Sequence, residues 1–237
     1  MKKLFLIIAL LSSNLSAEEI YVAVAANFTA TSKAISEEFE KATGHKVKLS
    51  FGSTGKLYTQ IMNGAPFQVF LAADAKHPEK LAQNGEGIKD TLFTYATGKL
   101  VLWSLQENPE QLFKENAFKK FAIANPETAP YGTAAVETLK SMDRWEELQN
   151  KIVKGDNISQ TQQFIATGNA EIGFISLAQA TQNGHFWEVP QHFYTPLHQQ
   201  AILLKKAAEQ AAPRAFLAFL KTPTAIKLIT QAGYSIE

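Results

Sequence analysis

Apolar runs alternate with helix-like patterns along the first part of the chain. The first run, residues 20–26, is mostly apolar and breaks at Asn27, after which apolar residues recur at helical spacing until Gly44. Further runs of both kinds follow. The pattern predicts strands over residues 20–26, 46–51 and 68–73, and helices over residues 29–43, 56–63 and 75–86. This β-α-β-α-β order predicts a mostly parallel sheet covered by helices.

Strand-like runs continue through the second half of the chain. They cover residues 98–104, 121–125, 151–153, 171–175 and 200–204. The first and the last of these runs are candidates for the two connections of a hinge, so we expect an α/β protein with two lobes around a central cleft. The lobe boundaries that we expect are residues 18–98 and 205–237 for a discontinuous first lobe and residues 99–204 for an inserted second lobe.

Four of the predicted strands end in small or polar turns that begin a helix. These turns are residues 26–29, 52–55, 130–133 and 157–160. Ligands of open α/β sheets gather at the carboxyl ends of strands, and helix N-termini present unpaired N–H donors with a partial positive charge. Each turn alone is typical of an ordinary N-cap. Their recurrence in both halves favours a shared anion site in the cleft.

The residue types in these turns restrict the anion. None of the four turns contains Arg, Asp or Glu, and the nearest lysine is Lys56, directly after the second turn. A protonated oxyanion such as hydrogen phosphate needs an acceptor for its proton, whereas donor-only turns favour a fully deprotonated tetrahedral dianion. Neutral donors can hold such an ion, because each hydrogen bond to a charged acceptor contributes about 1.5–3 kcal/mol.

The N-terminus has the pattern of a secretory signal peptide. Lys2 and Lys3 precede the apolar residues 4–11, and the small residues at 15–17 suit cleavage. A stretch of that length is too short to span a bilayer, which needs roughly 20 residues. We therefore expect residues 1–17 to be removed and the mature protein to reside in a bacterial periplasm.

Composition excludes several other kinds of site. The chain has no cysteine, which excludes a disulfide, a thiolate metal site and a lipid-anchored cysteine. Loss of the predicted signal peptide would leave a net charge of about −1, which implies no broad attraction to nucleic acid or to a membrane surface. The five histidines lack the i, i+4 spacing of a zinc site. We expect no resident metal ion and no cofactor.

Several segments together resemble the periplasmic molybdate-binding proteins of ABC transporters. They are AANF at 25–28, GSTGKLYTQIMNGAPFQVFLAAD at 52–74, YATGKLVLW at 95–103, NPETAPYGTAA at 125–135 and GNAEIGFISLAQ at 168–179. The resemblance implies the type II periplasmic-binding-protein fold. It also implies a monomeric, non-enzymatic carrier that binds molybdate or tungstate by hydrogen bonds and delivers the ion to a membrane permease.

The resemblance also implies which residues bind the ion. They are Asn27, Ser53, Thr54, Tyr131 and Ile158, with Ala26 and Ser176 as secondary candidates. Asn27 would contact the ion through its side chain and N–H, Ser53 and Thr54 through hydroxyls, and Ile158 through its N–H. Some relatives place a binding Tyr where this chain has Ser176, so Tyr131 is a candidate for the missing hydroxyl.

Two alternatives differ from a molybdate carrier. The first is a carrier of sulfate or of another tetrahedral oxyanion with the same fold. Sulfate would need the same donors as molybdate, because both ions are tetrahedral dianions, and only cavity size could separate them. A serine hydrolase is a different class: Ser53 and Lys56 match the S-x-x-K pattern in which lysine activates serine. The chain lacks the Ser-Asp-Asn and Lys-Thr-Gly elements of those enzymes, so we expect no catalytic residues.

Overall fold

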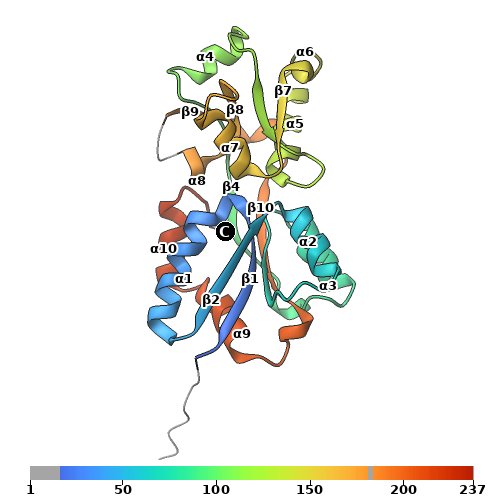
Figure 1. Cartoon of the computed structure of the whole chain (residues 1–237), viewed down its shortest axis with the longest axis vertical. Helices are drawn as coiled ribbons and strands as arrows, with labels where there is room; N and C mark the ends of the chain where they lie inside the picture. The colour runs from blue at the N-terminus through green and yellow to red at the C-terminus, as the bar shows by residue number, and fades with distance from the viewer. Residues whose placement is uncertain (1–16, 181–183, 237) are drawn as a thin grey trace, which may run out of the picture.

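Two five-stranded sheets, each covered by helices, form two lobes in the computed structural model of the chain (Figure 1). The structure describes residues 17–180 and 184–236. The predicted signal peptide lies outside the described residues except for Ala17. All eight strands expected from the apolar runs are present, two further strands at residues 93–98 and 185–188 were not expected, and the two-lobed α/β architecture is confirmed.

The first sheet has the strand order β2-β1-β3-β10-β4. Its strands are β1 (Glu19–Ala25), β2 (Lys46–Gly52), β3 (Val69–Leu71), β4 (Phe93–Gly98) and β10 (Leu197–Leu203). β1 lies parallel to β2 and β3, and β10 lies antiparallel to β3 and β4. The carboxyl ends of β1 and β2 therefore meet at one edge of the lobe, with Ala25 opposite Gly52.

Helices cover both faces of the first sheet. They are α1 (Thr29–Thr43), α9 (Ala211–Phe219) and α10 (Pro223–Gln231) on one face, and α2 (Thr54–Met62) and α3 (Lys76–Gln83) on the other. Phe39 of α1 packs edge-on against Phe216 of α9, while Leu57 and Ile61 of α2 fill the opposite core. Burial of both faces explains why β1 and β3 are almost wholly apolar.

The second sheet has the strand order β7-β6-β8-β5-β9. Its strands are β5 (Leu100–Ser104), β6 (Phe121–Ala124), β7 (Ile152–Gly155), β8 (Ile172–Ser176) and β9 (His185–Glu188). Its helices are α4 (Pro109–Lys114), α5 (Pro130–Ser141), α6 (Trp145–Leu148), α7 (Ile158–Ala166) and α8 (Leu177–Ala180). β6 runs parallel to β7 and β8, so the strand ends that lead into α5 and α7 point the same way.

Five short 3-10 helices complete the described elements. They are η1 (Ala26–Phe28), η2 (Lys89–Thr91), η3 (Gln149–Lys151), η4 (Gln191–Phe193) and η5 (Lys205–Ala207). In the part of the chain that the structure describes, no helix is both long enough and apolar enough to cross a bilayer.

The chain crosses between the sheets twice, from β4 to β5 and from β9 back to β10. β10 differs from the sequence-based expectation, which included it in the second lobe with residues 99–204. It pairs with β3 and β4 and so belongs to the first sheet. The reason is that an apolar run such as residues 200–204 suits a central strand of either sheet equally well, and only the long-range pairing distinguishes them.

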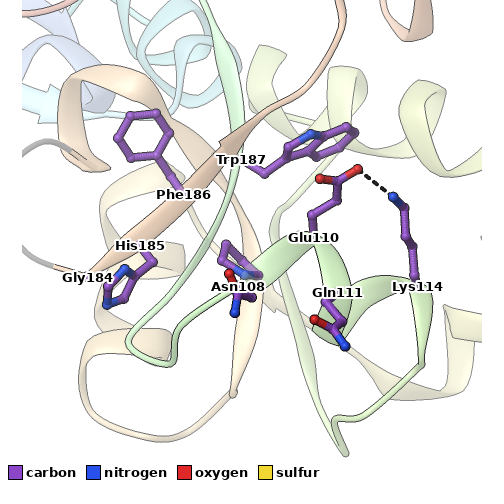
Figure 2. A pocket seen from close by; sticks show the side chains of 9 residues that line it. Asn108, Glu110, Gln111, Lys114, Gly184, His185, Phe186 and Trp187 are labelled. Carbon is purple, nitrogen blue, oxygen red and sulfur yellow. Dashed lines mark hydrogen bonds and ion pairs between the residues drawn. The ribbon is translucent and has the colours of Figure 1, made fainter.

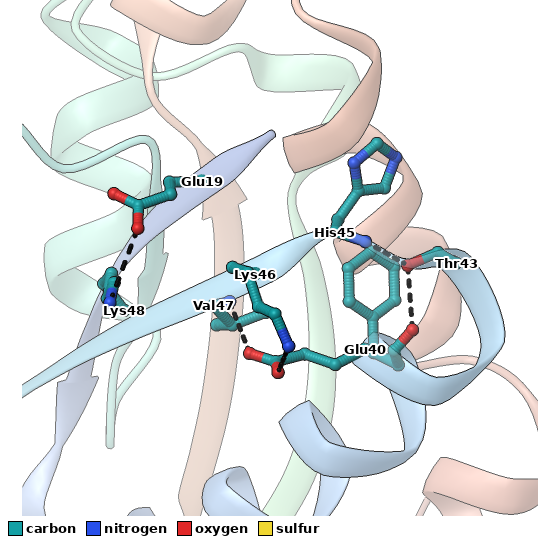
Figure 3. Close-up of polar contacts among 8 residues, drawn as sticks. Glu19, Glu40, Thr43, His45, Lys46, Val47 and Lys48 are labelled. Carbon is teal, nitrogen blue, oxygen red and sulfur yellow. Dashed lines mark hydrogen bonds and ion pairs between the residues drawn. The ribbon is translucent and has the colours of Figure 1, made fainter. Parts of the chain in front are cut away.

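The edge strand β2 is held in place by the end of α1 (Figure 3). Gly44 adopts a positive φ of 78° and caps α1 by donating to the carbonyl of Glu40 at 2.9 Å. The Glu40 carboxylate accepts from the N–H of Val47 at 2.8 Å and pairs with Lys46 at 2.9 Å. These contacts, led by the Val47 bond, lower the pKa of Glu40. The anchored start of β2 positions the turn at its far end.

Candidate functional site

The four predicted turns meet in one small cavity between the lobes. Its lining residues are Ala25, Ala26, Asn27, Gly52, Ser53, Thr54, Ala73, Ala129, Pro130, Tyr131, Asn157 and Ile158. Its volume is about 10 Å³. None of these residues carries a charged side chain. Six of the seven candidate residues line this cavity, and their role as ligands to an ion stays a prediction.

Ser53 contributes an unused hydroxyl to the first-lobe wall. It stands at the N-cap position of α2, yet its side chain makes no cap hydrogen bond. The residue is 3% exposed, and its Oγ has no hydrogen-bond partner among the described residues. An unpaired buried hydroxyl costs about 1–3 kcal/mol. The ordinary N-cap interpretation is therefore wrong for Ser53, and its hydroxyl is free for a ligand.

Thr54 and η1 supply further donors on the same wall. The Thr54 hydroxyl oxygen accepts from the N–H of Ala73 at 3.0 Å, which leaves its own proton available. Ala26 and Asn27 begin η1 directly after β1, where the first N–H groups of a helical turn have no partner within the turn. The first wall thus carries two hydroxyls and backbone N–H groups.

The second-lobe wall is built from the first turns of α5 and α7. Asn157 caps α7 by accepting from the N–H groups of Ser159 and Gln160 at 3.0 and 3.1 Å, so the cap interpretation is correct for this turn. That cap leaves the N–H of Ile158 without a partner from the Asn157 side chain. Tyr131, in the first turn of α5, is 1% exposed.

The Asn27 side chain is held by residues that the sequence did not single out. Its Nδ2 donates to Gln199 Oε1 at 2.9 Å and to the hydroxyl of Tyr234 at 3.0 Å. Both amide hydrogens are thereby used, so the backbone N–H is the donor that Asn27 can offer an ion. The Tyr234 hydroxyl donates in return to the Asn27 carbonyl at 2.8 Å.

The phenols around the cavity are neutral donors. Burial raises the pKa of Tyr131 and of Tyr95 well above the ordinary value, and burial also raises the pKa of Tyr234. Tyr131 accepts at its oxygen from Gln199 Nε2 at 3.4 Å. A protonated Tyr131 whose oxygen already accepts a hydrogen bond keeps its own proton for another acceptor.

Ser176 does not line the cavity. Its hydroxyl donates to Gln179 Oε1 at 2.8 Å, and Gln179 Nε2 donates to Ser159 Oγ at 3.2 Å. Ser159 in turn donates to the carbonyl of Ala26 at 3.1 Å. Ser176 is therefore the start of a hydrogen-bond chain that reaches the first lobe, because β8 ends beside α8 rather than facing the cavity.

Other contacts hold the lobes together around the cavity. The N–H of Gly55 donates to the carbonyl of Thr128 at 2.8 Å, and Lys56 Nζ lies 3.0 Å from Asp156 Oδ2. Each pair joins the first lobe to the second. The structure is thus a closed form of the cleft.

The S-x-x-K arrangement of a serine hydrolase is not assembled. Lys56 pairs with Asp156 across the cleft, and Ser53 Oγ has no hydrogen-bond partner among the residues described. A lysine that activated serine would have to lie within hydrogen-bond reach of it. Within residues 17–180 and 184–236, no group of three or more metal-ligating side chains is present.

A larger hollow of about 730 Å³ lies on the second lobe alone, between α4 and β9 (Figure 2). It is lined by Asn108, Pro109, Glu110, Gln111, Lys114, Gly184, His185, Phe186 and Trp187. Its opposite charges, Glu110 and Lys114, neutralise each other at 2.7 Å. All of its lining residues belong to the second lobe, so this hollow is not enclosed by walls from both lobes as the interlobe cavity is.

Comparison with known proteins shows the family of the chain. The family model for bacterial extracellular solute-binding proteins matches residues 20–235. The chain is 48% identical to the molybdate-binding protein ModA of Azotobacter vinelandii, over 96% of this chain and 94% of that protein. It is 46% identical to ModA of Rhodobacter capsulatus, over 94% and 90%.

A solved structure of a molybdate-binding protein also matches the chain. The periplasmic molybdate-binding protein of Azotobacter vinelandii superposes with a TM-score of 0.88 and 39% identity, covering 92% of this chain and 99% of that one. The predicted periplasmic-binding-protein fold is confirmed. The chain therefore belongs to the bacterial extracellular solute-binding protein family, in the branch of the periplasmic molybdate-binding proteins.

Proposed function

We propose that this protein captures molybdate, and tungstate in the same way, in the interlobe cavity and delivers the ion to the permease of an ABC transporter. The observation that carries the proposal is the unpaired Ser53 hydroxyl, buried in an uncharged cavity where turns from both lobes meet. The names of the close relatives favour molybdate as the ion.

The donors favour a fully deprotonated tetrahedral ion. Ser53 and Thr54 offer hydroxyl protons, Tyr131 offers a phenol proton, and Asn27 and Ile158 offer N–H groups. No carboxylate lines the cavity to accept a proton from the ligand. Hydrogen phosphate would therefore leave its own proton unpaired, at a cost of about 1–3 kcal/mol. Sulfate meets the same donors, so we assign discrimination between the two dianions to cavity size.

Capture requires the lobes to open and close. A cavity of about 10 Å³ holds at most one water molecule, so the walls must separate to admit an ion. Closure then brings the second set of donors onto the ion and excludes water, which strengthens each electrostatic contact. Gly55 with Thr128 and Ser159 with Ala26 are the backbone-directed contacts that re-form on closure.

The carrier is proposed to act in the periplasm after loss of residues 1–17, as a monomer and without catalytic activity. We assign residues 18–98 and 197–237 to the first lobe and residues 99–196 to the second, because β10 pairs within the first sheet. The ion pair of Lys56 with Asp156 supports a role for Lys56 in closure rather than in activating Ser53.

Removal of the Ser53 hydroxyl tests the site. Ser53→Ala is expected to weaken molybdate binding about 10- to 150-fold, because one hydrogen bond to a charged acceptor is lost. Stability without molybdate should stay the same or rise, since the hydroxyl has no partner to lose. Calorimetric titration measures the first effect and thermal unfolding the second.

Ser36→Ala is the matched control. Ser36 Oγ, in α1, is also buried without a partner, but Ser36 does not line the cavity. This variant should bind molybdate like the unaltered protein. Equal affinities for Ser53→Ala and the unaltered protein would remove Ser53 from the site.

A further inference from the structure

A buried polar cluster lies behind the cavity, where β10 returns from the second lobe. Gln199 of β10 is its centre and is 0% exposed. The other members are Asn27, Tyr95, Tyr131 and Tyr234. The β10 ladder shifts register between Gln199 and Gln200, at an irregularity of the kind that re-aims a side chain.

Gln199 bonds to a cavity residue of each lobe. Its Oε1 accepts from Asn27 Nδ2 of η1 at 2.9 Å. The Tyr95 hydroxyl of β4 lies 3.1 Å from the same Oε1 and 3.0 Å from the carbonyl oxygen of Ala72, so these two acceptors share its one proton. Its Nε2 donates to the hydroxyl oxygen of Tyr131 in α5 at 3.4 Å. One amide group therefore connects the first-lobe wall to the second-lobe wall.

The direction of these hydrogen bonds determines what the cavity can bind. A hydroxyl that accepts from Gln199 Nε2 keeps its own proton for another acceptor, and Tyr131 lines the cavity. A carboxylate in place of the amide would reverse this bond and draw the Tyr131 proton away from the cavity. The amide at position 199 is thus the group that keeps Tyr131 a donor toward a ligand.

Gly98, the last residue of β4, leaves room for the contact between Tyr131 and Gln199 because it has no side chain. A Cβ added to Gly98 would lie 2.1 Å from the Tyr131 hydroxyl oxygen and 2.6 Å from Gln199 Nε2. Both atoms therefore occupy space that any other residue at position 98 would fill. The pairing of Tyr131 with Gln199 is built into the strand that leads to the second lobe.

We propose that Gln199 is a positioning residue that sets the donor direction of the oxyanion site, by directing the Tyr131 hydroxyl proton at the bound ion. This inference rests on the proposed function. Gln199 need not touch the ion, and it acts through Tyr131.

A double-mutant cycle tests the proposal. Gln199→Met keeps the length of the side chain and removes its polar atoms, and it should lower molybdate affinity about tenfold. In the Tyr131→Phe background, the fold-loss of molybdate affinity caused by Gln199→Met should be at least three times smaller than in the unaltered protein, because the hydroxyl that Gln199 directs is absent. Calorimetric titration of all four proteins gives the coupling, and circular dichroism confirms that each is folded.

Gln200→Met is the matched control on the adjacent position of β10. Gln200 Oε1 is buried without a hydrogen-bond partner among the described residues, so this side chain does not direct the Tyr131 hydroxyl and molybdate affinity should change less than twofold. A second variant, Gln199→Glu, should lower molybdate affinity more than Gln199→Met, because its carboxylate accepts the Tyr131 proton.

The titrations distinguish a failure of the proposed function from a failure of the role assigned to Gln199. If the unaltered protein gives no heat with molybdate, the proposed function itself fails. If it binds molybdate and the effects of Gln199→Met and Tyr131→Phe are additive, only the role of Gln199 is overturned. Equal losses in Gln199→Glu and Gln199→Met would likewise overturn it.

Discussion

Gly98→Ala is expected to weaken molybdate binding by about 100-fold, or ~2.7 kcal/mol, while the protein stays folded. The added methyl would lie 2.1 Å from the Tyr131 hydroxyl oxygen and 2.6 Å from Gln199 Nε2, so both side chains must move. Displacement removes the Tyr131 donor from the ion and breaks the link to Gln199. Calorimetric titration measures the affinity, and far-ultraviolet circular dichroism checks the fold.

The same substitution in the Tyr131→Phe background is its control. Phe has no phenol oxygen to meet the new methyl, so the further loss caused by Gly98→Ala should shrink well below 100-fold. An unchanged molybdate affinity in Gly98→Ala alone would contradict a role in binding for the Tyr131 hydroxyl that lies against Gly98.

Gly55→Val is expected to weaken molybdate binding by roughly 30- to 100-fold, chiefly through faster release. A Cβ at Gly55 would lie 3.1 Å from both the Cα and the carbonyl oxygen of Thr128 in the opposite lobe. The two further methyl groups of valine would press on that backbone and hold the lobes apart. Stopped-flow measurement of the release rate tests this, and small-angle scattering with molybdate should show a more open molecule.

Lys56→Ala is the control for Gly55→Val. It removes a contact between the lobes without adding atoms that hold the lobes apart. Lys56 and Asp156 are 47% and 66% exposed, and exposed ion pairs contribute about 1 kcal/mol or less. We therefore expect less than about a fivefold loss of molybdate affinity. A release rate in Gly55→Val equal to that of Lys56→Ala would show that contact between Gly55 and Thr128 does not control closure.

The strand-to-helix turns could be predicted because they are local features. A buried apolar run followed by a small or polar residue and helical spacing predicted the junctions after β1 and β2, and the structure has a helical turn at both. The same reasoning predicted the start of α7 at Asn157. Parallel strands then bring such junctions to the same edge of each sheet, which is why local patterns predicted a shared cavity.

The residues behind the cavity could not be predicted, because their role depends on long-range contacts. Gln199 is separated by 172 positions from Asn27 and by 68 from Tyr131. In the sequence it is one of two adjacent glutamines before an apolar run, and the pattern does not show which of the two joins the buried cluster behind the cavity. A polar side chain within a buried strand is the signal that could have identified it, since such a group must be hydrogen-bonded.

Ser176 and β10 illustrate the same limit in different ways. Ser176 was a candidate because some members of the family that the chain resembles have a binding Tyr at this position. In the structure its hydroxyl donates to the Gln179 side chain, which in turn donates to Ser159. The apolar residues of β10 suit either sheet, and their pairing with β3 and β4 decides between them. Local pattern predicts what an element is, whereas partners distant in sequence decide where it packs.

Calorimetric titration of the mature protein with molybdate, tungstate, sulfate and phosphate tests the central claim most directly. With an uncharged cavity of neutral donors and discrimination assigned to the size of the cavity closed around the ion, the protein should bind molybdate and tungstate at least about 100-fold more tightly than sulfate, and phosphate more weakly still. Sulfate binding as tight as molybdate binding would contradict selection by cavity size and would make the protein a general carrier of tetrahedral dianions.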